Sequence, residues 1–156
     1  MLQRRTATGL LLFSLLCGVV ASQTVPPLDF WLKAIKNPLT APDAEEVWNT
    51  TFKDAIMAGQ QFPYLEGTVV SIEQTADGPK VLLAMEGDGV ANAALLFNGR
   101  PCALKSEPEL GTTVKFVGVA KSFTREPFMI TFWPIELQGL EAEPGKGYAP
   151  TRCRVT

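Results

Sequence analysis

The sequence predicts a mainly β fold with an N-terminal α-helical hairpin, an α+β class, on the strength of three observations. Apolar residues recur at helical spacing between residues 30 and 56. From Tyr64 onward, β-branched and aromatic residues alternate with period two, and clusters of Gly, Pro, Asn and Asp separate these runs. With 156 residues, 46% of them apolar and 19% charged, the chain is long enough to bury one ordinary core.

Residues 1–22 are typical of a secretory signal peptide. Arg4 and Arg5 precede an apolar stretch of about a dozen residues, and Val19-Val20-Ala21 fits the small-x-small cleavage rule. The stretch is shorter than the ~20 residues of a membrane-spanning helix. We therefore expect cleavage after Ala21 or Ser22 and an extracytoplasmic mature protein, periplasmic or secreted, with no stable membrane span; a retained membrane anchor is the alternative.

Residues 23–62 are predicted to form a linker and a helical hairpin. Asp29 is a suitable cap for a short helix over residues 30–35, which we expect to end before Pro38. A second helix of about four turns is expected from a capping-box pattern at Thr40 up to Gly59. The connection between them is short, which favours an antiparallel pair.

Two tryptophans, Trp31 and Trp48, lie on the apolar faces of these helices. One interpretation places them in the core, as is usual for large apolar side chains. The other leaves them partly exposed as a docking surface for a protein partner, because a contiguous apolar patch marks such contacts.

A small β-barrel is predicted over residues 63–138. Its five strands are expected at residues 65–73, 80–86, 91–97, 113–123 and 128–137, with a short extended piece at 102–105. A meander of three strands followed by a β-hairpin, with Gly118 where a strand must bend, fits a five-stranded barrel of the oligonucleotide/oligosaccharide-binding (OB) type. No helix is evident between the third and fourth strands, so the helical hairpin is expected to cover one end of the barrel.

Two cysteines remain after signal cleavage, Cys102 and Cys153. In an oxidising compartment such a pair most often forms a disulfide, here closing a loop of about 50 residues and worth about 4 kcal/mol by chain entropy. We expect it to clasp the Gly/Pro-rich tail, residues 139–156, to the body of the domain. Two unpaired thiols are the alternative.

Charge and composition exclude several functions. The chain has no histidine, which removes Ser-His-Asp and Cys-His catalysis and every histidine-containing metal site. Loss of Arg4 and Arg5 from 14 basic residues leaves 12 against 16 acidic, a net charge of −4. Nucleic-acid binding is not expected at this charge. We expect no metal and no cofactor.

Four stretches resemble a known family: LDFWLKAI, AEEVWNTTFKDAI, GTVVSI and ELGTTVKFVGVAKSFTREPFMITF. They resemble the C-terminal module of exported tetratricopeptide-repeat proteins of Acidobacteria, in which a tryptophan-bearing helix pair precedes a small β domain. The match covers residues 28–137 and depends on Gly111, Phe116, Gly118, Val119, Ser122, Phe123, Thr124, Pro127, Phe128, Met129 and Thr131. The resemblance implies architecture and compartment and not an activity. This chain lacks the upstream repeats and adds both cysteines, so whatever the repeats scaffold is absent here or supplied by another protein.

Enzymatic residues are hard to find. Glu86 and Asp88 lie between glycines at a turn, where solvated side chains are usual, and Lys121 and Ser122 are adjacent on a strand and so point to opposite faces. We therefore expect no enzymatic activity.

Two binding functions stay open. The first is docking on an envelope protein partner, such as a helical-repeat protein, through Trp31 and Trp48. The second is recognition of a small glycan or peptide, with Phe123, Arg125 and Trp133 as a stacking and hydrogen-bonding edge, although Phe123 fits a plug of the barrel end equally well. Docking predicts partly exposed tryptophans, whereas ligand recognition predicts a concave face with convergent polar groups.

Overall fold

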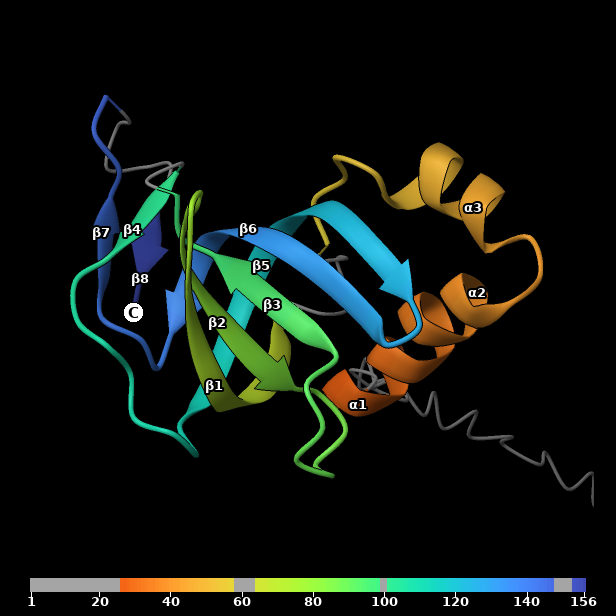
Figure 1. Cartoon of the computed structure of the whole chain (residues 1–156), viewed down its shortest axis with the longest axis horizontal. Helices are drawn as coiled ribbons and strands as arrows, with labels where there is room; N and C mark the ends of the chain where they lie inside the picture. Colours follow the sequence, from red (N-terminus) through yellow and green to blue (C-terminus); the bar gives the residue numbers. More distant parts are fainter. Residues whose placement is uncertain (1–25, 58–63, 99–100, 148–152) are drawn as a thin grey trace, which may run out of the picture.

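The computed structural model describes residues 26–57, 64–98, 101–147 and 153–156 (Figure 1). The expected signal peptide, residues 1–22, lies outside the described residues. A six-stranded sheet occupies the centre, with two helical segments beside the turn that joins β5 and β6, and a two-stranded sheet at the opposite end (Figure 1). No helix in the described part of the chain is long and apolar enough to cross a bilayer.

The first helical segment is longer than predicted. It runs without a break through α1 (Pro27–Phe30), a π-helical segment η1 (Trp31–Lys36) and α2 (Asn37–Thr40). The expectation that it ends before Pro38 is wrong, because this proline lies in the first turn of α2, where its missing N–H is tolerated. The preceding wide turn closes with a hydrogen bond from the N–H of Asn37 to the carbonyl of Leu32.

The second helical segment is shorter than predicted. It comprises α3 (Ala44–Val47) and η2 (Trp48–Phe52), and it ends well before Gly59. No side-chain cap hydrogen bond begins it, and the hydroxyl of Thr40 donates instead to carbonyls of its own helix. The predicted capping box is therefore wrong.

Residues 54–57 leave the helix and pair with strand β5 (Thr113–Arg125). The N–H of Met57 donates to the carbonyl of Gly118 over 2.8 Å, and the N–H of Ala120 donates to the carbonyl of Ala55 over 3.0 Å. A free strand edge offers a row of unpaired backbone groups, and this tertiary contact overrides the local helical pattern.

The five predicted strands are confirmed to within two residues at each end. They are β1 (Leu65–Thr75), β2 (Gly78–Ala84), β3 (Ala93–Leu96), β5 and β6 (Phe128–Gln138). The short extended piece is also present as β4 (Cys102–Leu104), which pairs with β7 (Ala142–Pro144), while β8 (Arg154–Val155) pairs with β6.

Each of the five main strands pairs with two of the other four. β1 pairs with β2 and β5, β2 with β3, and β5 with β6, all antiparallel, whereas β3 also pairs with β6 in parallel. A register shift between Val117 and Gly118 bends β5 at the glycine singled out in the sequence. A Cβ at Gly118 would lie 3.0 Å from the Cβ of Phe132, so the strands approach closely here.

One hydrophobic core joins the helices to the inner face of the sheet. Val114 and Phe116 of β5 are fully buried on either side of the exposed Lys115, as period two predicts. The rings of Phe116 and Phe132 meet edge to face, with centroids 5.3 Å apart. The same core includes Trp31 and Ile35 of the first helical segment.

The predicted disulfide joins Cys102 and Cys153, whose Cα atoms are 5.2 Å apart. Both cysteines are buried. The bond connects the start of β4 to the residue that precedes β8, and it therefore fixes this part of the tail to the sheet.

Candidate functional site

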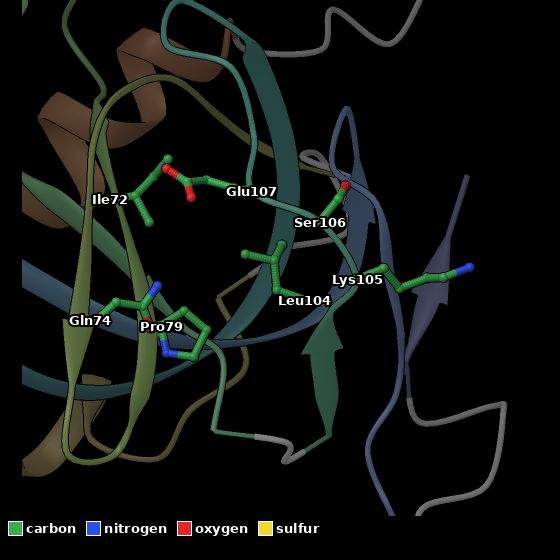
Figure 2. A pocket seen from close by; sticks show the side chains of 7 residues that line it. All are labelled: Ile72, Gln74, Pro79, Leu104, Lys105, Ser106 and Glu107. Carbon is green, nitrogen blue, oxygen red and sulfur yellow. The ribbon is translucent and has the colours of Figure 1, made fainter.

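A surface hollow of about 180 Å³ opens between the hairpin of β1 and β2 and the chain that follows β4 (Figure 2). It is lined by Ile72, Gln74, Pro79, Leu104, Lys105, Ser106 and Glu107. One wall comes from neighbouring strands, and the other, residues 104–107, comes from the connection between β3 and β5.

The two walls are held in place independently of any ligand. The N–H of Lys105 donates to the carbonyl of Glu141 over 2.9 Å, and the hydroxyl of Ser106 donates to the carboxylate of Glu141 over 2.8 Å. On the other side, the hydroxyl of Thr75 donates to the carbonyl of Gly78 over 2.7 Å and braces the turn of the hairpin. The hollow is therefore largely preformed, as ligand sites usually are.

The base of the hollow is apolar and its rim is polar. Ile72, Pro79 and Leu104 are half-buried, whereas Gln74 and Glu107 are exposed. In Figure 2, Leu104 points toward the hairpin, while Lys105 extends away from it. Within the described part of the chain, the side chains of Gln74 and Glu107 make no hydrogen bond and no ion pair, so both remain available to a ligand.

The predicted loop of residues 74–79 does contribute Gln74 and Pro79 to this hollow. The second wall was missed, because residues 104–107 follow a short strand far away in the sequence. The signal that pointed to them was Cys102, since the disulfide holds the start of this wall against the tail.

The three predicted ligand residues are each engaged elsewhere. Phe123 packs on Trp48 with ring centroids 4.8 Å apart, which supports the plug interpretation. Arg125 donates from Nη2 to the carbonyls of Thr40 (3.4 Å) and Ala41 (3.2 Å), where a helix ends. None of the three lines the hollow.

Trp133 is half-buried and is covered by a cation. The Nζ of Lys121 lies 4.2 Å from the centroid of its ring and also pairs with the carboxylate of Asp54. The hydrogen bond from Lys121 lowers the pKa of Asp54. This group of three links residues 54–57 to β5 and β6, and the lysine occupies one face of the indole.

The predicted docking residues are buried. Trp31 is 1% exposed and Trp48 is 6% exposed. Trp31 meets Phe128 edge to face. Trp48 stacks on Phe52 and also contacts the tilted ring of Phe123. The partial exposure that docking through these side chains requires is absent, and the core interpretation is correct for both.

Glu86 was interpreted as a solvated turn residue, and this is wrong. Both oxygens of its carboxylate accept hydrogen bonds of 2.7 Å from Lys36, and one also accepts from the amide of Asn92 and, at 3.5 Å, from the indole of Trp31. Its side chain is 17% exposed. This cluster fastens the first helical segment to the sheet, whereas Asp88 does cap an exposed turn.

No group of three or more metal-ligating side chains is found among residues 26–57, 64–98, 101–147 and 153–156. Comparison with protein-family models, with curated proteins and with solved structures returns no match. The hollow and its two walls are therefore the basis on which a function can be argued.

Proposed function

We propose that the protein is a non-enzymatic binding module of the OB type that acts outside the cytoplasm and recognises part of a small ligand, a peptide or a glycan, in the hollow between residues 72–79 and 104–107. One observation supports this most directly. The hollow combines an apolar base, formed by Ile72, Pro79 and Leu104, with the polar side chains of Gln74 and Glu107, which make no hydrogen bond or ion pair within the described residues.

The strand pairing supports the OB part of the proposal. β1, β2, β3, β6 and β5 follow one another and return to β1, with β3 and β6 parallel, which is the order expected of a small closed Greek-key barrel. In such barrels the loop between the first two strands is one side of the ligand site. That loop here is the turn beside Gln74 and Pro79.

Near the opposite loop, between β5 and β6, two residues are engaged with the helical segments. Arg125 is bound to the end of α2, and Phe123 packs on Trp48. The β1–β2 side differs, because there the connection between β3 and β5 provides a second wall. The binding function proposed here therefore lies at a different end of the sheet from the residues named in the sequence.

The disulfide supports the compartment. Disulfides persist in oxidising environments such as the periplasm or the exterior, and Cys102 and Cys153 are joined. Together with the signal-peptide pattern of residues 1–22 and the resemblance to exported acidobacterial modules, it supports a protein that acts after export.

The size of the hollow limits what it holds. Sites for drug-sized ligands measure roughly 300–1,000 Å³, whereas this one measures about 180 Å³. It accommodates one or two side chains, or one sugar unit, of a larger ligand. An envelope protein partner remains a candidate source of that ligand. Such a partner would bind at the hollow and not at Trp31 or Trp48.

The test is ligand mapping by NMR on the ¹⁵N-labelled protein with its disulfide intact. Pools of short peptides and of oligosaccharides are added separately, and we expect one pool to shift the amide signals of Ile72, Gln74, Leu104 and Glu107. The blocking variant Leu104→Glu should abolish these shifts. Leu110→Glu is the matched control, because Leu110 is 66% exposed in the same connection and does not line the hollow.

Two results would overturn the proposal. One is the absence of shifts at the hollow with every pool at millimolar concentration. The other is an unchanged response in Leu104→Glu after circular dichroism has shown that the variant is folded.

A further inference from the structure

The second half of β1 has a free edge, and a proline shows which backbone groups point to it. Gln74 lies opposite Pro79 in the β1–β2 pair. Since proline has no N–H, this pair cannot exchange hydrogen bonds, and the alternation of an antiparallel ladder makes Glu73 and Thr75 the bonded residues. The N–H and C=O groups of Gln74, and by the same alternation those of Ile72 opposite Val81, therefore point away from β2.

No backbone partner meets these groups within the described ranges. β1 pairs with β5 only over its first four residues, Leu65–Thr68. Val69 then exchanges hydrogen bonds with Gly111 and Thr112, after which the chain before β5 diverges from β1. Beyond Val69, Ile72 and Gln74 of β1 line the hollow, and residues 104–107 line it from the other side.

A strand edge beside an apolar hollow is the geometry of strand addition. An extended peptide lies about 4.8 Å from the strand that it joins, and its alternate side chains share a face with those of that strand. The side chains of Ile72 and Gln74 line the hollow. Alternate side chains of an added peptide would thus lie against Ile72 and Leu104, while its backbone pairs with Ile72 and Gln74.

The charges at the hollow favour a basic residue in that peptide. Glu107 lines the hollow without an ion pair in the described structure, whereas Lys105 extends away from it in Figure 2 and Glu141 already accepts from Ser106. A cationic side chain that is placed beside Glu107 gains a favourable pairing, and an acidic one is repelled.

We infer that the ligand is an extended peptide segment of another protein, with two apolar side chains two positions apart and a neighbouring Lys or Arg, added as a strand to Ile72 and Gln74. This inference rests on the proposed function and names the class of its ligand. A glycan has no regular array of N–H and C=O groups to match the edge. A second folded copy is disfavoured, because residues 104–107 line the hollow beside this part of β1 and would obstruct the approach of a whole second sheet.

The probe is a pool of acetylated, amidated hexapeptides in which Val or Leu alternates with Thr, Lys or Glu. Binding is measured by fluorescence polarisation and by the exchange protection of the amides of Ile72 and Gln74. We expect peptides with Lys to be selected over those with Glu, both amides to gain protection, and N-methylation of the pairing residues in the selected peptide to weaken binding at least tenfold.

Two protein variants isolate the backbone contribution. Gln74→Pro, which an unpaired edge position tolerates, removes the outward N–H together with the amide side chain and should weaken binding about tenfold through the lost backbone hydrogen bond and the fit around it. Gln74→Ala keeps the N–H and should bind within about threefold of the original. Glu107→Lys should reverse the preference so that peptides with Glu are selected.

The outcomes separate the two proposals. If only oligosaccharides shift the hollow, or if N-methylated peptides and Gln74→Pro bind unchanged, the binding function stands and strand addition is wrong. If the edge amides become protected with protein concentration alone and sedimentation shows a dimer, the occupant is a second copy and the inference is wrong. If no pool affects the hollow, both proposals fall.

Discussion

Lys36 and Glu86 join the first helical segment to the sheet: the ammonium nitrogen of Lys36 lies 2.7 Å from each carboxylate oxygen of Glu86. The side chains are 30% and 17% exposed, so water screens this pair less than it would on an open surface. The carboxylate also accepts from Asn92, which is 5% exposed.

Glu86→Ala should lower the free energy of unfolding by about 1–3 kcal/mol, because it leaves the amide of Asn92 and the ammonium of Lys36 without their acceptor. Urea unfolding followed by tryptophan fluorescence measures the change. Asp88→Ala, in the adjacent exposed turn, is the control and should cost less than about 0.5 kcal/mol. Equal losses in the two variants would contradict the role assigned to Glu86.

Arg125→Ala should lower stability and leave ligand binding unchanged. Its guanidinium donates to the carbonyls at the end of α2, and such contacts at a helix C-terminus are worth about 0.3–1 kcal/mol. Arg125→Lys should recover part of the loss. Thermal melting and the peptide assay are run on the same samples; weaker binding with an unchanged melting temperature would restore Arg125 as a ligand residue.

The Asp54–Lys121 pair should make stability depend on pH in the acid range. The pKa of Asp54 is lowered by its hydrogen bond with Lys121, so its carboxylate binds a proton more readily in the unfolded chain. Its contribution is therefore full above about pH 5 and is lost as the pH falls below the ordinary carboxylate value of about 4 toward the lower folded pKa.

The measurement is the difference in the free energy of unfolding between the original protein and Asp54→Asn at several pH values. Asparagine is the matched substitution because Asp54 has φ 62°, a conformation that Asn adopts more readily than most residues. Since the carboxylate is exposed, the difference should be small and should shrink further near 1 M salt. A difference that does not change between pH 6 and pH 2 would contradict the assignment.

Gly78→Ala should destabilise the hairpin beside the hollow by about 1–3 kcal/mol. The glycine has φ 118°, and a Cβ there would be pushed against the carbonyl of Phe97. Gly87→Ala is the control, because it also has a positive φ but meets nothing nearby. The larger loss is expected at Gly78, and the amide signals of Gln74 should broaden in that variant only.

The strands could be predicted from the sequence because their signal is local. Period-two alternation and Gly- or Pro-containing turns identified all five main strands, and Gly118 marked the bend in β5. The helix ends could not be predicted in this way. Pro38 is accommodated by a π-helical turn before it, and residues 54–57 form a bridge to β5 because the edge of that strand is available.

The candidate site was only half predictable. The loop around Gln74 and Pro79 could be named from the turn pattern, but its opposite wall, residues 104–107, is brought there by pairing of β4 with β7. Trp31 and Trp48 matched a docking face and a core face equally well, since a helical pattern shows which side is apolar and not what covers it. Their burial follows from contacts with Phe128 and Phe123 across the molecule.

The positions of the two cysteines impose an order on maturation. The whole of β5 and β6 lies between Cys102 and Cys153, so every strand of the main sheet except β8 has been synthesised before the second thiol is available. The covalent link can therefore close only after these strands have been synthesised. Before the two thiols are oxidised, the pairing of β4 with β7 and the hydrogen bonds to Glu141 hold this wall, and the disulfide adds a covalent constraint to them.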